Sequence, residues 1–287
     1  MQLTDSQVEQ FWADGVLVVP DAVSGESLQA LRTCFADWVE QSRSHDRPFG
    51  EGLDGRPRFD LEAGHNALAP ALRRVNAPCE ISQVYRDAMA DSPMTDMVAD
   101  LIGPNVKHHH NKINSKLPGA PTVVKWHQDF PFTPHTNTDL VTALPMVDEV
   151  TEENGPLEVL PGSHRGPLYS LWHDSTFTGA VAEADARVMQ AGAVRCTGGA
   201  GSVCLMHTCL AHGSAANLSS RPRTLFISVY SAADAMPVTR NPVPNEHEGL
   251  IVRGEDPKII RASGFEVRIP AYPKSTSFFS QQASADG

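Results

Sequence analysis

The sequence lacks the features of membrane-spanning and nucleic-acid-binding proteins. None of its apolar runs approaches the ~20 residues that cross a bilayer, and its first residues contain neither the basic nor the apolar segment of a secretory signal. Its 23 Lys and Arg are outnumbered by 34 Asp and Glu, which gives a formal net charge of −11. These cations never cluster beyond adjacent pairs. Because such a chain presents no extended positive field, we expect neither nucleic acid nor membrane as a partner.

Cysteine is also scarce, and its pattern argues against a disulfide framework. The five cysteines form an odd number with no C-x-x-C pair, and most lie within apolar patterns. We therefore predict buried free thiols and a reducing, cytoplasmic location. With 41% apolar and 20% charged residues over 287 positions, the composition is that of an ordinary globular protein.

The first hundred residues have the periodicity of helices. Thr4–Gln7 has the pattern of a capping box, and Gly15 is a helix C-cap signal. Apolar residues recur at helical spacing after Ser24, and Ser92 followed by Pro93 predicts an N-cap and a first helical position. Helices are therefore expected up to Gly15, after Ser24, and over the ranges Gln83–Ala90 and Pro93–Ile102, with a short strand at Val16–Pro20.

Residues 42–77 have no sustained period and are rich in Arg, Asp, Gly and Pro. A loop of this length in a compact protein is usually functional or mobile. We interpret it as part of the wall or lid of a pocket.

From Asn105 onward, short apolar segments alternate with Gly, Pro and Asn. Asn154-Gly155 predicts a hairpin between the two segments that flank it. Helices followed by many short strands indicate a mainly β fold with flanking helices, an antiparallel sandwich or barrel rather than a doubly wound sheet. The expected strands are Val106–Lys116, Val123–Phe130, Leu140–Val147, Pro156–Leu160, Ser202–Met206 and Thr224–Ser231.

The stretch Val123–Phe132, V-V-K-W-H-Q-D-F-P-F, contains the first candidate metal ligands. In an extended strand, residues two apart point to one face, so His127 and Asp129 would project side by side. A second histidine would complete the 2-His-1-carboxylate set that binds Fe(II) and leaves coordination positions open. His212 is the candidate, because small residues follow it and an arginine on the next strand could hold a carboxylate.

Together these motifs resemble the phytanoyl-CoA dioxygenase family of Fe(II)/2-oxoglutarate-dependent oxygenases, which includes ectoine hydroxylase. The resemblance covers roughly Leu3 to Ala233. It is carried, in chain order, by L-T-x-x-Q-V-x-x-F-x-x-D-G-V-L-V-V-P, W-H-Q-D-F, E-N-G-P-L-E-V-L-P-G-S-H-R-G at Glu153–Gly166, and H-G-S-A-A-N-L-S-S-R-P-R-T-L from His212. It implies a double-stranded β-helix (jelly-roll, cupin-like) core with an N-terminal helical layer.

We expect one domain over residues 1–280. Its helical layer would span about 1–104, its jelly-roll core about 105–235 and a C-terminal lid or extension about 236–280. The Ser/Gln/Ala-rich residues 281–287 are expected to form a flexible tail.

The resemblance also implies roles for individual residues. His127, Asp129 and His212 would bind Fe(II), and Arg223, eleven residues after His212, would hold the distal carboxylate of 2-oxoglutarate beside Ser214. Arg221 stays open as the alternative cation. Weaker candidates for contact with co-substrate or substrate are Asn111, Lys112 and Asn114, on a strand whose inward face is left open, and Thr142, Trp172 and His173.

The implied reaction consumes 2-oxoglutarate and O2 at iron, hydroxylates a small organic substrate, and releases succinate and CO2. Related halogenases have a small residue in place of the carboxylate, so Asp129 favours hydroxylation. Desaturation, cyclisation or demethylation by the same chemistry stay open, as does a non-catalytic metal-binding sensor or binding module. The sequence leaves open the substrate and the choice between monomer and homodimer.

Overall fold

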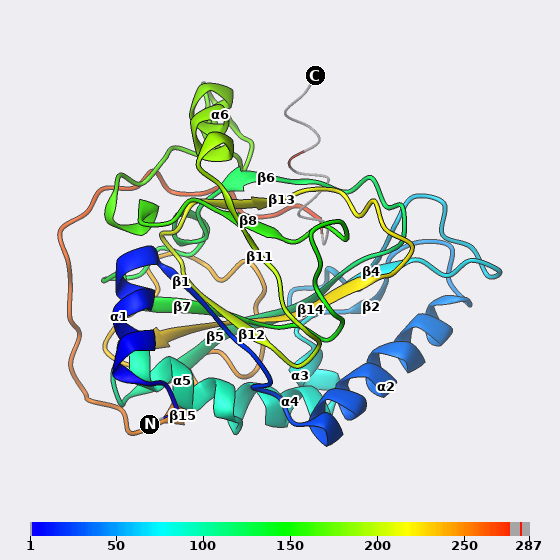
Figure 1. The fold of residues 1–287 in the computed structure, drawn as a ribbon, viewed down its shortest axis with the longest axis horizontal. Coiled ribbons are helices and arrows are strands. Elements are labelled where there is room, and N and C mark those ends of the chain that lie inside the picture. The colour runs from blue at the N-terminus through cyan, green and yellow to red at the C-terminus, as the bar shows by residue number, and fades with distance from the viewer. Residues whose placement is uncertain (1, 276–281, 283–287) are drawn as a thin grey trace.

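The computed structural model describes residues 2–275 and residue 282 (Figure 1). The predicted tail 281–287 therefore lies outside the described residues apart from Gln282. Among the described residues, no helix is long and apolar enough to cross a membrane. The helices are α1 (Asp5–Asp14), α2 (Gly25–Ser42), α3 (Pro78–Ile81), α4 (Gln83–Ala90), α5 (Pro93–Ile102) and α6 (Glu183–Ala191).

The predicted helix starts and stops are confirmed. Thr4 and Gln7 form a capping box at α1, and the helix ends at Gly15, whose φ of 80° suits a residue without Cβ. Ser24 caps α2 through the backbone N–H of Ser27. Pro93 opens α5 directly after Ser92. Local hydrogen bonding therefore determines these boundaries.

The larger of two sheets contains nine strands among the described residues. Its strands run in the order β1-β12-β7-β14-β5-β4-β3-β2, and β15 also pairs with β5. All of these pairings are antiparallel. The strands are β1 (Val16–Val19), β2 (Phe49–Glu51), β3 (Pro57–Leu61), β4 (Leu72–Asn76), β5 (Val106–Lys116), β7 (Leu140–Pro145), β12 (Val203–His207), β14 (Arg223–Ala232) and β15 (Ile251–Arg253).

A smaller antiparallel sheet faces the larger one (Figure 1). Its order is β11-β8-β13-β6, and a separate hairpin joins β9 to β10. From β5 to β8 and again from β11 to β14, consecutive strands alternate between the two sheets, which is the arrangement of a double-stranded β-helix, so the predicted fold class is confirmed. The strands are β6 (Val124–His127), β8 (Leu157–Val159), β9 (Trp172–His173), β10 (Thr176–Phe177), β11 (Val194–Cys196) and β13 (His212–Ser214).

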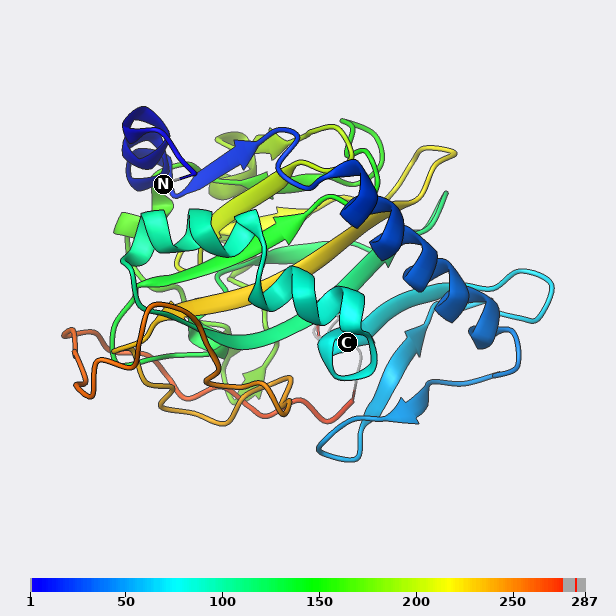
Figure 2. The same cartoon turned by 90° about the horizontal axis from the view of Figure 1, so that it is seen from below.

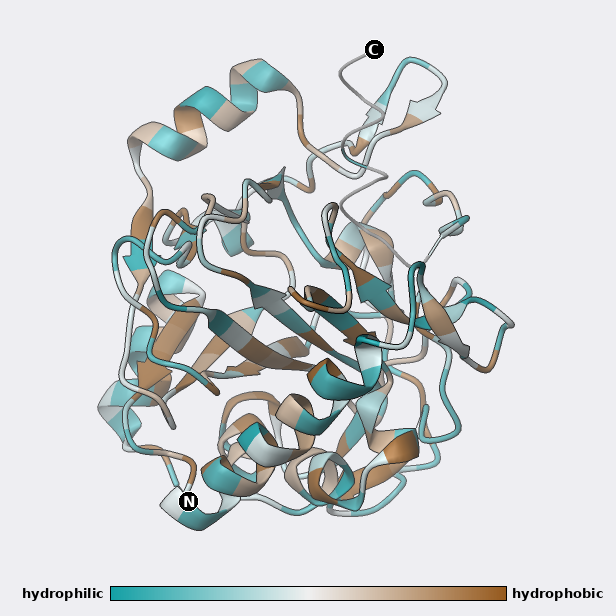
Figure 3. Ribbon diagram, turned by 90° about the vertical axis from the view of Figure 1, so that its right-hand side faces the viewer, coloured by the Kyte–Doolittle hydropathy of each residue, from teal (hydrophilic) through white to brown (hydrophobic). Residues whose placement is uncertain are grey.

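Helices α2 to α5 cover the outer face of the larger sheet (Figure 2). The main hydrophobic core lies between these two layers, where Phe11, Tyr85 and Phe226 are fully buried. Apolar residues are concentrated on the central strands and on the sides of the helices that face them (Figure 3). The inner face of the larger sheet is therefore left for the smaller sheet and for a cavity between them.

Two sequence-based expectations about connections were wrong. Residues 42–77 are not a loop, because β2, β3 and β4 extend the larger sheet beyond β5. The N-terminal segment is thus not purely helical. Asn154-Gly155 does not close a hairpin, because β7 and β8 lie in different sheets and the turn carries the chain between them. The prediction of free thiols is confirmed, since all five cysteines are unpaired.

Candidate iron and 2-oxoglutarate site

The three predicted metal ligands meet at the edge of the smaller sheet. His127 ends β6 and His212 begins β13, and the two residues are direct partners in the antiparallel register. The Asp129 Oδ1 atom lies 3.6 Å from His127 Nε2 and 3.7 Å from His212 Nε2. The ligand atoms of these three side chains all lie within 4.8 Å of one another, close enough to hold one metal ion.

Asp129 reaches this position by a different backbone path from the one predicted. The strand ends at His127, and Asp129 has the helical angles φ −71° and ψ −37° at the start of a 3-10 helix, Phe130–Phe132. The two side chains therefore converge because the chain turns after β6, not because they share one face of a strand.

Hydrogen bonds to the backbone set the tautomers of both histidines. His127 Nδ1 lies 2.8 Å from the carbonyl of Lys125, and His212 Nδ1 lies 3.0 Å from that of Leu210. A carbonyl only accepts, so Nδ1 carries the proton in each ring and Nε2 presents its lone pair toward Asp129. Burial lowers the pKa of His212 to about 4, which keeps this ring neutral at physiological pH.

The carboxylate of Asp129 is held by its second oxygen. Thr142 Oγ1, on β7, donates to Asp129 Oδ2 at 2.9 Å and leaves Oδ1 facing the histidines. Burial disfavours the charged carboxylate, but His212, His127 and Lys112 outweigh it and hold the pKa of Asp129 well below its usual range. Two imidazoles, one of them kept neutral by burial, and one ionised carboxylate on one side of a cavity fit a divalent iron ion with open coordination positions.

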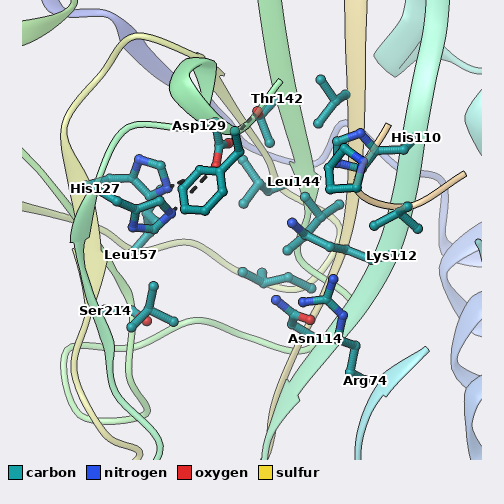
Figure 4. A pocket seen from close by; sticks show the side chains of 18 of the residues that line it. Arg74, His110, Lys112, Asn114, His127, Asp129, Thr142, Leu144, Leu157 and Ser214 are labelled. Carbon is teal, nitrogen blue, oxygen red and sulfur yellow. Dashed lines mark hydrogen bonds and ion pairs between the residues drawn. The ribbon is translucent and has the colours of Figure 1, made fainter. Parts of the chain in front are cut away.

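The cavity beside these ligands lies between the two sheets (Figure 4). The centres of water-sized molecules can occupy about 120 Å³ of it. A single water needs ~10–15 Å³ by this measure, so the space has room for several water-sized groups. Phe132, Leu144 and Ile227 are among its apolar lining residues.

Arg223 lies in the cavity wall at the start of β14 and is 4% exposed. Its Nε and Nη2 donate to the carbonyl of Gly155, at 3.1 and 2.9 Å. Burial lowers the pKa of Arg223 to about 10, so the guanidinium stays charged at neutral pH. Arg221 instead forms a surface ion pair with Glu149 and does not line the cavity.

Ser214 also lines the cavity, near a buried lysine on the facing strand. The Nζ atom of Lys116 donates to Ser214 Oγ at 2.7 Å, and Lys116 pairs with Arg223 across β5 and β14. Burial and the charge of Arg223 lower the pKa of Lys116 to about 6. Arg223, Lys116 and Ser214 thus form one polar end of the cavity, where a carboxylate could accept several hydrogen bonds.

Comparison with known proteins matches residues 11–225 to the model of the family described as phytanoyl-CoA dioxygenase (PhyH). The chain belongs to this family. It is 35% identical to a probable alpha-ketoglutarate-dependent hypophosphite dioxygenase of Stutzerimonas stutzeri over 228 residues, 76% of this chain and 77% of that protein. It is 27% identical to L-proline trans-4-hydroxylase of Streptomyces griseoviridis, over 82% and 88% of the two chains.

Solved structures agree with the fold of this phytanoyl-CoA dioxygenase family member. The apo form of EctD from S. alaskensis aligns with a TM-score of 0.68 at 24% identity, over 88% of each chain. The form of EctD with bound Fe aligns with a TM-score of 0.66, over 91% of this chain and 88% of that one. The predictions of family, jelly-roll fold and enzyme class are confirmed: the protein is a 2-oxoglutarate-dependent non-haem iron dioxygenase.

The structure shows which side chains of β5 point into the cavity. Lys112 and Asn114 line the cavity together with His110 and Lys116. Asn111 points the other way, and its Nδ2 lies 2.9 Å from Cys79 Sγ. Asn111 therefore does not reach the cavity, because alternate residues of a strand face opposite sides.

Trp172 and His173 also lie outside this cavity. Trp172 packs under the guanidinium of Arg268, 4.0 Å from its ring centre. His173 lines a second hollow next to β6 and α6.

Sequence reasoning missed Lys116, Arg74 and Arg56, which all line the cavity. Lys116 could have been found, because it has the same parity along the strand as Lys112 and Asn114. Arg74 and Arg56 lie in residues 42–77, which were interpreted as part of a pocket wall, and both do line the cavity. The two arginines were not singled out, because the segment was not recognised as strands that extend the sheet.

Proposed function

We propose that His127, Asp129 and His212 hold Fe(II), and that Arg223 with Ser214 and Lys116 binds the distal carboxylate of 2-oxoglutarate. Bound iron and 2-oxoglutarate supply the oxygen chemistry that hydroxylates a small molecule held in the same cavity. The observation that carries the proposal is the convergence of three ligand atoms within 4.8 Å beside a cavity whose far end is closed by a buried arginine.

The protein residues contribute binding and orientation. Thr142 holds the Asp129 carboxylate by Oδ2, which leaves Oδ1 toward the histidines, and the backbone carbonyls of Lys125 and Leu210 fix the two rings. Gly155 orients Arg223 through its carbonyl. Such groups position ligands without taking part in bond changes.

The proposal further treats the chain as one catalytic unit. Pro242, Val243, Pro273 and Ser275 line the cavity from the C-terminal segment, which supports its role as a cover over a site built by the two sheets. The five free cysteines support a reducing, cytoplasmic setting.

Succinate formation from 2-oxoglutarate, with and without Fe(II), tests the activity. Hypophosphite, L-proline and ectoine are the first compounds to add, because these names are attached to relatives of the chain. A true substrate should raise succinate above the level without substrate and yield a product that contains one oxygen atom from O2.

Variants of the ligands test the site. We expect His212→Ala and Asp129→Ala to lose iron binding and succinate formation, whereas His173→Ala, a matched histidine outside the cavity, keeps both. Unchanged turnover in both ligand variants would refute the assignment.

A further inference from the structure

The cavity is strongly cationic although the protein as a whole is acidic. Among the described residues that line it, Asp129 is the sole acid. The formal charge of the whole chain is −11, so the concentration of positive charge in the cavity is local. The lining cations are Arg56, Arg74, Lys112, Lys116 and Arg223.

Three of these five cations already have partners or assigned ligands. Arg56 forms an ion pair with Asp54 at 2.7 Å. Arg223 and Lys116 lie at the end proposed for 2-oxoglutarate, and Asp129 is proposed to bind iron. Arg74 and Lys112 remain.

Neither remaining cation has an acidic partner within hydrogen-bonding distance among the described residues. Arg74 is 5% exposed, and its Nε donates to the side-chain amide of Asn76 at 2.8 Å. The nearby carboxylates Asp60 and Glu62 are taken by Arg73, which faces the other side of β4. Arg74 is buried and Lys112 is half-buried, and cations withdrawn from water without an ion-pair partner are costly unless a ligand supplies the counter-charge.

The two side chains lie on one wall. Arg74 is the register partner of Asn114, and Lys112 is the register partner of Asn76, so adjacent strands β4 and β5 bring them together. Figure 4 shows Arg74, Asn114 and Lys112 gathered on the wall opposite His127 and Asp129.

On β5, Lys112 lies farthest from the 2-oxoglutarate end, and Arg74 lies between the two ends, because its register partner Asn114 is two residues from both Lys112 and Lys116. Lys112 and Lys116 are four residues apart on β5, which is roughly 13 Å of strand at ~3.3 Å per residue. That exceeds the separation of the two carboxylates within one 2-oxoglutarate molecule. A molecule bound to iron and Arg223 would therefore leave Lys112 facing the remaining space, with Arg74 on the adjacent strand beside it.

We infer that Arg74 and Lys112 form a subsite for the oxyanion group of the substrate, so that the molecule hydroxylated is a small anion with a carboxylate or a phosphorus oxyanion. The inference rests on the proposed function and specifies its substrate class. The planar guanidinium of Arg74 can donate two parallel hydrogen bonds to a carboxylate or a phosphorus oxyanion, and the ammonium group of Lys112 adds a second positive charge.

The charge states agree with this assignment. Burial lowers the pKa of Arg74 to about 10. Burial and the charge of Arg74 lower that of Lys112 to about 8, against the opposing effect of Asp129. Both groups remain mostly protonated at pH 7, and a bound anion would favour this form further.

Calorimetric titration of the anaerobic enzyme loaded with Fe(II) and 2-oxoglutarate tests the subsite. Propionate and methylphosphonate represent the two head groups, and propionamide is the neutral isostere of propionate. We expect both anions to bind better than propionamide in the wild type. The tighter of the two identifies the preferred head group.

Lys112→Met and Arg74→Gln should each weaken anion binding by at least about tenfold, the loss of one charge-assisted hydrogen bond. Lys112→Arg should restore most of the affinity. Arg187→Gln, which removes an exposed cation on α6, should change nothing. The affinity for 2-oxoglutarate should stay within about threefold in all four variants.

Thermal unfolding distinguishes a binding role from a structural one. Because Lys112 is a half-buried cation near the like charge of Arg74, Lys112→Met should unfold at a higher temperature than the ligand-free wild type. A lower unfolding temperature would indicate that Lys112 stabilises the fold instead, and would count against the subsite.

Three results would overturn the inference: equal binding of propionamide and propionate, no binding of either anion to the loaded enzyme, or an equal loss of 2-oxoglutarate affinity in Lys112→Met. Failure of the wild type to bind 2-oxoglutarate at all would refute the proposed function itself. Loading the enzyme with 2-oxoglutarate therefore distinguishes a failure of the proposed function from a failure of the inferred subsite.

Discussion

The two oxygens of Asp129 have different partners, and this division predicts an effect of Thr142. Removing the hydroxyl in Thr142→Val should free Oδ2 and lower iron affinity by about 10- to 100-fold, the usual effect of losing a group that orients a ligand. Thr142→Ser retains the hydroxyl and should recover most of the affinity. Calorimetric titration with Fe(II) measures the iron affinity of both variants. Unchanged affinity in Thr142→Val would contradict the proposed role of Thr142.

The two neighbouring arginines provide a matched pair. Arg223→Gln should raise the dissociation constant of 2-oxoglutarate by at least about tenfold, since it removes a buried cation from the cavity wall. Arg221→Gln removes an exposed cation that pairs with Glu149 and should have little effect. Iron binding should be unchanged in both. The opposite ranking would show that Arg221 is the co-substrate residue.

Lys116 makes 2-oxoglutarate binding depend on pH. Its pKa of about 6 in the free protein reflects burial and Arg223, partly offset by Glu158 and Glu62. A bound carboxylate should raise this pKa, so binding takes up a proton near neutral pH. Affinity should be highest below about pH 6 and should fall as pH rises from there toward the pKa of the complex.

Calorimetry of the iron-loaded enzyme in buffers of different ionisation enthalpy measures this proton uptake. Lys116→Met should abolish the uptake. An uptake that persists in this variant would assign the proton to another group.

At the scale of elements, the turn before β8 links the two sheets to the co-substrate. Gly155 has a φ of 80°, and a Cβ there would lie 2.7 Å from the carbonyl oxygen of Ala215. Gly155→Ala should therefore displace the carbonyl that holds Arg223. We expect the KM for 2-oxoglutarate to rise by about tenfold and iron affinity to persist.

Gly249 is the matched control for this variant. It has the same φ of 80°, but a Cβ there would meet nothing within 4 Å. Gly249→Ala thus introduces the same backbone strain without the clash, and should leave the KM unchanged. An equal rise in both variants would attribute the effect to general destabilisation.

At the scale of the whole molecule, ligands should couple the two sheets. Fe(II) at the proposed site would contact residues of β6 and β13 and Asp129, whereas 2-oxoglutarate would connect them to β5 and β14. A ligand at one hundred times its dissociation constant adds about 2.7 kcal/mol to stability. For a chain of this size that corresponds to an unfolding temperature higher by roughly 5–10 °C.

Anaerobic thermal unfolding with Fe(II) and 2-oxoglutarate measures this shift. Asp129→Ala, which lacks one ligand, should lose most of the gain from Fe(II). A wild-type protein whose unfolding temperature does not respond to either ligand would contradict the site.

The sequence alone predicted the structural features that depend on residues close together in the chain. The capping box at Thr4, the αL residue Gly15 and the Ser92-Pro93 start were all predictable, because a helix end depends on hydrogen bonds within one turn. Three candidate metal ligands were also predicted, through motif spacing and resemblance to a family. Their convergence is confirmed, although Asp129 lies outside the strand expected for it.

Tertiary structure alone decided where the chain pairs with distant segments. Whether Asn154-Gly155 closes a hairpin depends on which sheet receives β8, and the inward face of β5 depends on which layer covers each side. Arg74 became part of the cavity only when β4 paired with β5. The charges that we infer to select the substrate are thus set by contacts between strands far apart in sequence, whose pairing no local pattern encodes.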